Sequence, residues 1–182
     1  MKLKKSIFVI FSFFSMVSCG LSQVDRKEKV VKNVILLISD GTGLYQISSS
    51  FYFKKTKSNY ERFENIGLIK TSSSGFDVTD SAAGATAFAC GEKSFNGAVG
   101  VADDSTAIKN LVEIGYQNNI KTGVIATSSI IHATPASFYA HQFSRQMNDA
   151  ISKDLVESEV DFFAGGVYSF LRSMVKLIYL KN

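Results

Sequence analysis

Ser81 is the residue best placed for nucleophilic chemistry. It follows Asp80 and precedes the small residues 82–85, which can start a helix. The first N–H groups of a helix have no internal acceptors and the helix dipole is positive there, so a phosphate could approach the Ser81 hydroxyl. An Asp or Ser at such a place is also a common N-cap, so other parts of the chain must decide between the two interpretations.

A carboxylate is expected at the carboxyl edge of a central strand. Residues 34–38 are a continuous apolar run, which predicts a strand buried on both faces, and Asp40 follows directly. Ligands bind at this edge of parallel sheets, so Asp40 is a candidate site residue. The alternative is that Asp40 caps the helix expected over residues 44–53.

His132 and Thr134 form a third candidate group beside Pro135, the only proline of the chain. Pro135 disfavours helical geometry at Thr134 and suits the first helical position, so Thr134 is expected to be the N-cap. In an extended segment His132 and Thr134 project to the same side, where they could bind a metal directly or through water. Otherwise His132 is a hydrogen-bonded loop residue.

Arg145 completes the candidate set. It follows His141 by four residues and is expected on the same face of a helix. A guanidinium group can bind two oxygens of a phosphate at once. The alternative is a solvated arginine on a helix surface.

The pattern of apolar residues predicts an α/β fold. Strands are expected over residues 34–38, 67–71, 121–127 and 160–164, and helices over residues 44–53, from 81, from 105 to about 115, and over 147–157. In the glycine-rich loop 91–104, a turn is expected at Asn96-Gly97. Alternating helices and strands indicate a three-layer α/β/α arrangement around a mostly parallel sheet.

Length and charge exclude some classes of protein. At 182 residues with 46% hydrophobic content, the chain suits one globular domain with a substantial core. The net charge is +4, but the positive excess belongs to the two ends, and the body between them is slightly acidic. Because the body shows no basic patch with interleaved aromatic residues, nucleic acid is not an expected partner.

The start of the chain resembles a secretory signal of the lipoprotein type, expected over residues 1–19. Lysines precede an apolar run from Ile7 to Val17 that is too short to span a membrane, and Met16 to Gly20 resembles a lipoprotein cleavage box with Cys19 as the lipidated residue. Ordinary cleavage near Ser18 is the alternative. We therefore expect an exported protein, periplasmic or at the cell surface, held to the membrane through a lipid anchor.

Two further segments flank the expected domain. Residues 20–32 are polar and predict a tether. Residues 167–182 are apolar and basic, and they indicate either an amphipathic helix at the membrane surface or out-of-frame sequence; we favour the second. With Cys19 lipidated, Cys90 would have no disulfide partner, and its simplest role is packing.

Taken together, these motifs resemble the N-terminal part of the alkaline phosphatase family. The resemblance covers residues 33–166 in five ordered blocks: residues 33–43, 78–82, 96–97, 132–136 and 144–145. It implies a phosphate monoester hydrolase with two zinc ions and one magnesium ion, an incomplete form of the family's α/β fold, and a homodimer as a possible assembly.

The resemblance also implies a role for each candidate residue. Ser81 would be a metal-bound nucleophile that becomes a phosphoserine, and Asp40 would ligate both the second zinc and the magnesium. Thr134 would be a magnesium ligand, and His132 would act on that metal through water. Arg145 would bind the phosphate, with Asp80 orienting it.

The sequence departs from the family in its number of metal ligands. Family members continue well beyond this region and supply further histidines and carboxylates there, whereas His132 and His141 are the only histidines here. A zinc site needs three or four N, O or S ligands, so we expect this chain alone to be inactive or nearly so. The alternatives are a surface lipoprotein that binds phosphate or metal without turnover, and a phosphodiesterase or sulfatase relative, which commonly carries Thr or modified Cys as nucleophile.

Overall fold

The computed structural model describes residues 31–166. The chain divides into two compact units, residues 1–37 and residues 38–182, and each is described by itself. Residues 31–37 of the first unit form neither helix nor strand. The expected signal peptide, most of the expected tether and the tail from residue 167 lie outside the described residues.

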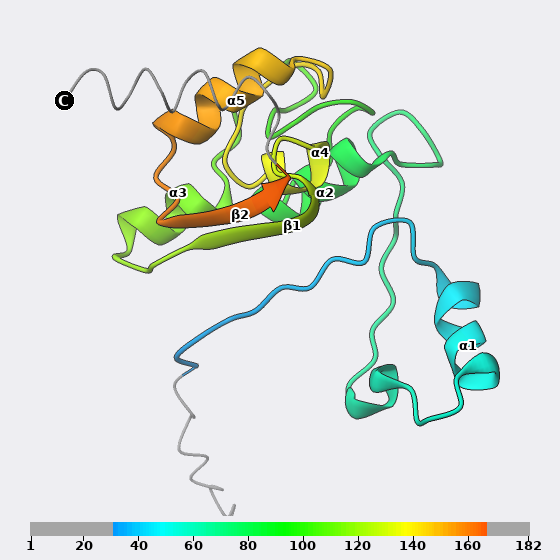
Figure 1. The fold of residues 1–182 in the computed structure, drawn as a ribbon. Helices are drawn as coiled ribbons and strands as arrows, with labels where there is room; N and C mark the ends of the chain where they lie inside the picture. Colours follow the sequence, from blue (N-terminus) through cyan, green and yellow to red (C-terminus); the bar gives the residue numbers. More distant parts are fainter. Residues whose placement is uncertain (1–30, 167–182) are drawn as a thin grey trace, which may run out of the picture. The chain divides into compact units, whose positions relative to one another are not determined.

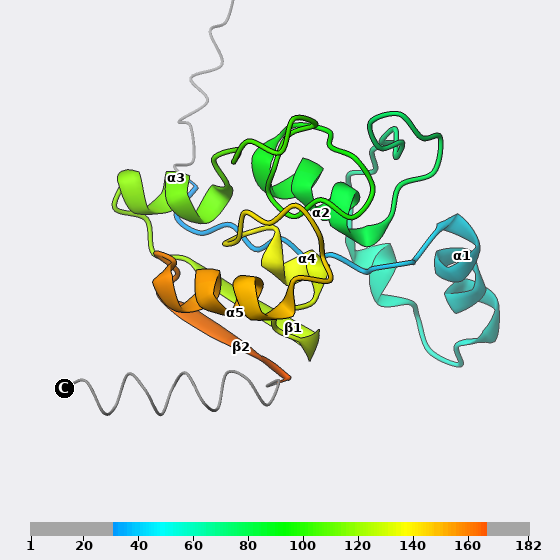
Figure 2. The ribbon, with the colours of Figure 1, turned by 90° about the horizontal axis from the view of Figure 1, so that it is seen from above.

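The sheet of the second unit has two parallel strands, β1 (Gly123–Ser129) and β2 (Phe162–Gly166). In their register Gly123 pairs with Phe162 and Ile125 with Ala164. The helix α5 (Asn148–Glu157) lies between the strands in sequence and over one face of the sheet in space (Figures 1 and 2). This strand–helix–strand order matches the α/β class expected from the sequence.

The core lies between this covered face and two further helices, α2 (Ser81–Cys90) and α4 (Ala133–Ala136). Ile151 and Leu155 of α5 are almost fully buried and join one cluster with Ile130, against which Val124 and other half-buried residues pack. Ile125, next to Val124, points to the other face and is 73% exposed. Alternation along β1 therefore separates a helix-covered face from an open one.

The helix α2 begins and ends as its sequence predicts. Asp80 is the N-cap, and its side chain accepts a hydrogen bond from the Ala83 N–H at 2.9 Å. Gly91 ends the helix in the left-handed region at φ 75°, where glycine is favoured because it has no Cβ. Five of the ten helical residues are buried, and all five are small, so α2 can lie close to α4.

Two predicted strands are absent from the described part of the chain. Residues 34–38 and 67–71 show no strand pairing, and their apolar side chains are mostly exposed: Ile35 by 83% and Leu68 by 99%. An apolar run becomes a strand only where a neighbouring strand satisfies its backbone hydrogen bonds. Neither run is a strand as the structure describes it, so these two predictions are wrong for the described residues.

The structure confirms the predicted bounds of one remaining helix and corrects the predicted start of another. The helix α1 (Leu44–Phe53) has the predicted bounds, and a short 3-10 helix η1 (Asn59–Arg62) follows it. The helix α3 (Leu111–Gln117) begins later than expected, because its N-cap is Asn110, not Ser105. Ser105 lies in a turn at φ 67°, whereas Asn110 accepts hydrogen bonds from Val112 and Glu113.

Two predictions about helical positions near the site also require correction. The N-cap of α4 is His132, and Thr134 is already inside the helix. Pro135 is the third helical residue; its missing N–H costs nothing there because first-turn N–H groups have no internal acceptor. Arg145 lies in a turn before α5, not on a helix shared with His141.

The Cys90 side chain is half-buried beside α3 residue Glu113 and its own neighbour Glu92. Burial of the Cys90 thiol, together with the nearby charges of Glu113 and Glu92, raises its pKa to about 11, so the thiol stays protonated at neutral pH. This agrees with a packing role.

No helix within residues 31–166 has the length and apolar character needed to cross a membrane.

Candidate active site

The Ser81 hydroxyl lies at the start of α2, and it points toward a carboxylate from a distant loop. Its Oγ donates a hydrogen bond to Asp40 Oδ1 at 3.2 Å. Because Asp80 provides the cap of α2, the Ser81 hydroxyl is not needed to close the helix end. Ser81 is therefore available for chemistry at a helix N-terminus.

Asp40 bridges two hydroxyl groups. Its second oxygen, Oδ2, accepts a hydrogen bond from Thr134 Oγ1 at 3.0 Å. The carboxylate is exposed, and the loop that carries it turns at Gly41, whose φ is 67°. The three groups come from that loop, from α2 and from α4, and together they present only oxygen atoms.

Arg145 lies between Asp80 and His132. Its Nη1 donates to Asp80 Oδ2 at 3.1 Å, and its Nη2 lies 3.1 Å from His132 Nε2. A guanidinium group can only donate, so His132 Nε2 is the acceptor in this contact. Among residues 31–166 two of the five guanidinium N–H groups are thus used, and the others make no hydrogen bond there.

These contacts close into a circuit of six residues. The Asp40 carboxylate contacts both Ser81 and Thr134. Arg145 contacts both Asp80 and His132. The circuit closes through the chain itself, because Asp80 directly precedes Ser81 and His132 lies two residues before Thr134. The structure therefore brings all six candidate residues together: Asp40, Asp80, Ser81, His132, Thr134 and Arg145. His141 is not among them, because its ring contacts the Gly100 carbonyl and Glu113 instead.

The helices α2 and α4, which carry Ser81 and Thr134, pack against each other. Thr86 and Ser137 are fully buried, and their hydroxyl oxygens lie 3.3 Å apart. The Ser137 hydroxyl also donates to the Ala133 carbonyl at 2.9 Å, and the Ala82 carbonyl lies 3.5 Å away. Small buried residues on both helices allow this approach, which sets the separation of Ser81 and Thr134.

Asp80 is ionised at neutral pH. Partial burial is the largest single influence on its carboxyl and raises the pKa. Hydrogen bonds from the Ala83 and Gly97 backbones, together with the hydrogen bond and positive charge of Arg145, outweigh that influence and leave the pKa below its ordinary value. Asp80 therefore gives Arg145 a charged partner that fixes its orientation.

The donor set fits magnesium better than zinc. Magnesium prefers oxygen ligands, and Ser81 and Thr134 each place a hydroxyl within hydrogen-bond distance of the Asp40 carboxylate. Zinc requires three or four N, O or S ligands. Among residues 31–166 no group of three or more His, Cys, Asp or Glu residues is arranged to hold a metal, so these residues supply only part of a zinc site.

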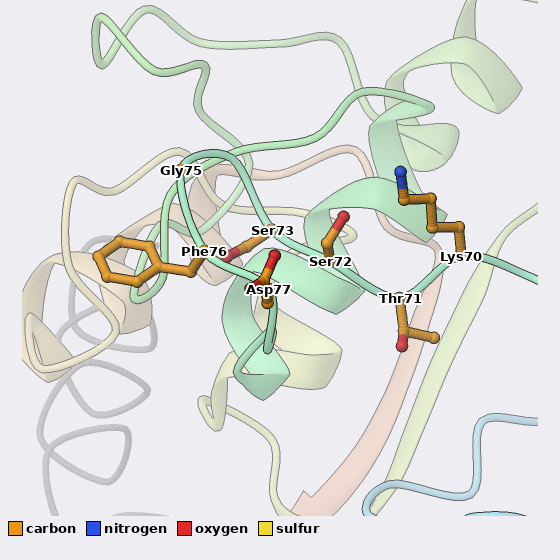
Figure 3. A pocket seen from close by; sticks show the side chains of 7 residues that line it. All are labelled: Lys70, Thr71, Ser72, Ser73, Gly75, Phe76 and Asp77. Carbon is orange, nitrogen blue, oxygen red and sulfur yellow. The ribbon is translucent and has the colours of Figure 1, made fainter.

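A hollow of about 510 Å³ lies outside the circuit. It is lined by seven residues, which curl around it in Figure 3: Lys70, Thr71, Ser72, Ser73, Gly75, Phe76 and Asp77. None of the six circuit residues lines this hollow. This hollow is therefore separate from the candidate site.

Sequence reasoning missed one residue that contacts the site. Asn96 was expected in a turn and in one block of the family resemblance, without a role at the site, but its side chain hydrogen-bonds the backbone on the N-terminal side of Ser81. The signal in the sequence was weak, because an Asn-Gly pair usually marks a turn by backbone conformation alone. Only the folded chain brings Asn96 and residues 78–80 together.

Comparison with known proteins shows a family match over most of the chain. A family model described as alkaline phosphatase matches residues 31–167. An alkaline phosphatase of Schizosaccharomyces pombe is 40% identical over 152 residues, which are 77% of this chain and 29% of the relative. Alkaline phosphatase 3 of Bacillus subtilis is 34% identical over 164 residues, 82% of this chain and 36% of the relative.

Solved structures give the same result. The alkaline phosphatase of the Antarctic bacterium TAB5 is 66% identical with a TM-score of 0.75, covering 78% of this chain and 41% of that one. A mutant of the TAB5 enzyme, 69% identical with a TM-score of 0.72, was solved with magnesium bound. The expected fold class, an incomplete alkaline-phosphatase-like α/β fold, is confirmed. The chain spans less than half the length of each of these four relatives.

Proposed function

Because the chain belongs to the alkaline phosphatase family, we propose that residues 31–166 carry the nucleophile, the phosphate-binding arginine and part of the metal site of a phosphate monoester hydrolase. The observation that supports this proposal most directly is the closed circuit of contacts that joins Ser81 to Asp40 and Arg145. A serine hydroxyl, a guanidinium and a carboxylate with free coordination capacity are the groups that phosphoryl transfer requires.

The proposed reaction has two steps. The Ser81 hydroxyl loses its proton to solvent as its oxygen forms a bond to phosphorus and the bond to the ester oxygen breaks, and the alcohol leaves with a proton taken from solvent. Water then hydrolyses the phosphoserine, which releases inorganic phosphate and restores Ser81. Arg145 binds the non-reacting oxygens of the phosphoryl group through its free N–H groups, and the ionised Asp80 holds it in that orientation.

Metal ions would be held by Asp40, Thr134, Ser81 and, through water, His132. Magnesium suits Asp40 and Thr134, and Asp40 and Ser81 would provide part of the zinc coordination. Bound divalent cations lower the pKa of a coordinated hydroxyl and offset the charge of the phosphoryl group. We propose that turnover needs zinc ligands additional to those within residues 31–166, and that this chain alone is nearly inactive.

One alternative function has an observation in its favour. Asp80 holds Arg145 near the start of α2, and Asp40 lies beside the Thr134 hydroxyl; these contacts would also suit a protein that binds phosphate or a divalent ion without turnover. Binding of inorganic phosphate with no release of product from any ester would identify that function.

A chimaera tests the proposed function. Residues 31–166 would replace the matching region of the TAB5 alkaline phosphatase, which supplies the remainder of a complete enzyme at 66% identity. With zinc and magnesium we expect the chimaera to hydrolyse an aryl phosphate far faster than its diester or sulfate counterpart, and the chain alone to show little or no turnover. A folded, metal-loaded chimaera without phosphatase activity would contradict the proposal.

We also propose that the protein is exported and anchored by lipid at Cys19. The support is the lysine-rich start, the short apolar run and the residues around Cys19. We expect cells that express the chain with labelled palmitate to incorporate label, and Cys19→Ser to abolish incorporation because the acceptor thiol is lost. Cys90→Ser is the matched control and should leave the label unchanged. Equal label in the Cys19→Ser chain would show that Cys19 is not the lipidated residue.

A further inference from the structure

Asn96 holds the segment that precedes the nucleophile. Its Oδ1 accepts a hydrogen bond from the Asp80 N–H at 3.0 Å, and its Nδ2 donates to the Val78 carbonyl at 3.1 Å. The one side chain therefore binds the backbone two residues apart, on both sides of Thr79. Since Asp80 and Ser81 are consecutive, this bracket fixes the point at which the chain enters α2.

The turn that carries Asn96 also holds the arginine segment. Ala98 N–H donates to the Phe95 carbonyl at 3.1 Å, and Gly97 has φ 96°, as the third residue of a type II turn requires. The Gly97 carbonyl accepts a hydrogen bond from the Arg145 N–H at 2.8 Å. Neighbouring residues of one turn thus contact both the nucleophile segment and the arginine segment.

The contact between the turn and the arginine segment extends in both directions along the chain. Val99 and Gln142 exchange two backbone hydrogen bonds, at 3.0 and 2.9 Å, as an antiparallel pair. The rings of Phe95 and Phe143 lie 5.3 Å apart. Residues 95–99 and 142–145 therefore run together as a unit, and movement of the turn would carry Arg145 with it.

From these contacts we propose that Asn96 is a positioning residue whose turn sets the separation between the Ser81 hydroxyl and the Arg145 guanidinium. The inference rests on the proposed function, because it gives this separation a purpose: in-line transfer needs the nucleophile and the groups that bind the phosphoryl oxygens at a fixed spacing. Asn96 is exposed and touches neither reacting group in the structure. Its effect is transmitted through the Asp80 backbone on one side and the Gly97 carbonyl on the other.

Amide hydrogen exchange of the full chain, followed by NMR, tests the proposal without requiring activity. In Asn96→Ala we expect the Asp80 amide to exchange about fivefold faster, the loss of one hydrogen bond. We expect the Arg145 amide, which Asn96 does not contact, to accelerate as well. Asn96→Asp keeps the acceptor for the Asp80 N–H, so both amides should return toward their wild-type rates. Amides of α3 and α5 should be unchanged in both variants.

The control is Asn118→Ala. Asn118 is also exposed and also donates through Nδ2 to a backbone carbonyl, that of Ile114, at the end of α3. Its truncation should leave the amides of Asp80 and Arg145 at wild-type rates. If Asn96→Ala leaves the Arg145 amide unchanged, or accelerates α3 and α5 equally, Asn96 is a local or general structural residue and the positioning proposal is wrong.

Calorimetry with inorganic phosphate and magnesium separates this inference from the proposed function. We expect wild-type chain to bind phosphate and Asn96→Ala to bind it about tenfold more weakly, with Asn118→Ala unchanged. Equal affinity of the Asn96→Ala and wild-type chains would overturn the positioning role even if the amides respond. If wild-type chain binds no phosphate, the proposed phosphate site of this chain fails, and the Arg145 exchange rate still decides whether Asn96 positions it.

Discussion

Replacing Ser81 by alanine is expected to lower phosphatase turnover of the chimaera by at least about three orders of magnitude and to remove all covalent phosphate from the protein. The alanine lacks the only atom that can bond to phosphorus in the proposed first step. The helix should not suffer, because alanine favours helices and Asp80 still caps α2 through the Ala83 N–H. The loss would therefore be chemical and not structural.

The measurement combines steady-state hydrolysis of an aryl phosphate with mass spectrometry of the peptide that contains residue 81 after acid quench. Ser128→Ala is the control, since Ser128 is exposed on β1 and its side chain makes only a long contact of 3.4 Å with the Ser129 carbonyl. That variant should retain activity and phosphoserine. Covalent phosphate on the Ser81→Ala chain, or activity close to wild type, would show that another group accepts the phosphoryl group.

The largest expected effect on stability comes from Gly100→Ala. Gly100 is buried at φ 64°, and a Cβ added there would lie 2.1 Å from the Ala140 carbonyl oxygen, far inside van der Waals contact. The same glycine donates to Thr86 Oγ1 and accepts from His141 Nδ1, so the backbone cannot move away without losing both bonds. We expect destabilisation by at least about 4 kcal/mol, a large part of the stability of a small domain.

Urea unfolding followed by circular dichroism measures this effect, and Gly91→Ala separates its two causes. Gly91 also has a positive φ, 75°, but a Cβ there would meet nothing within 4 Å. It should cost only the backbone strain, about 1–2 kcal/mol. If Gly100→Ala were no more destabilising than Gly91→Ala, the close approach of Gly100 to Ala140 described by the structure would be wrong.

Local patterns predicted the elements that need little help from distant residues. The start of α2 at Ser81 followed from Asp80 and a run of small residues, and the structure has this cap. The bounds of α1 and the strands β1 and β2 were also close to those expected. In each case hydrogen bonds within a few residues, or a steady apolar pattern, decide the backbone.

Two errors in the predicted helices had different causes, one local in the sequence and one long-range. Ser105 was expected to cap α3, yet Asn110 with Glu113 three residues later is the stronger signal, because both side chains satisfy backbone N–H groups. Arg145 was expected on a helix, but its N–H bonds the Gly97 carbonyl, which holds that segment in a turn. The first error could have been avoided from the sequence, whereas the second depends on a residue 48 positions away.

The sequence alone determined which chemistry is available: a serine at a helix start, a carboxylate after an apolar run, and an arginine able to bind phosphate. Only the tertiary structure decided that these groups meet, because Thr134 is 94 residues from Asp40 and Arg145 is 65 residues from Asp80. Such contacts depend on how α2 packs on α4 and on how the turn at Asn96 joins two segments. Short-range preferences carry no information about either, since packing is set by the fit of surfaces from distant parts of the chain.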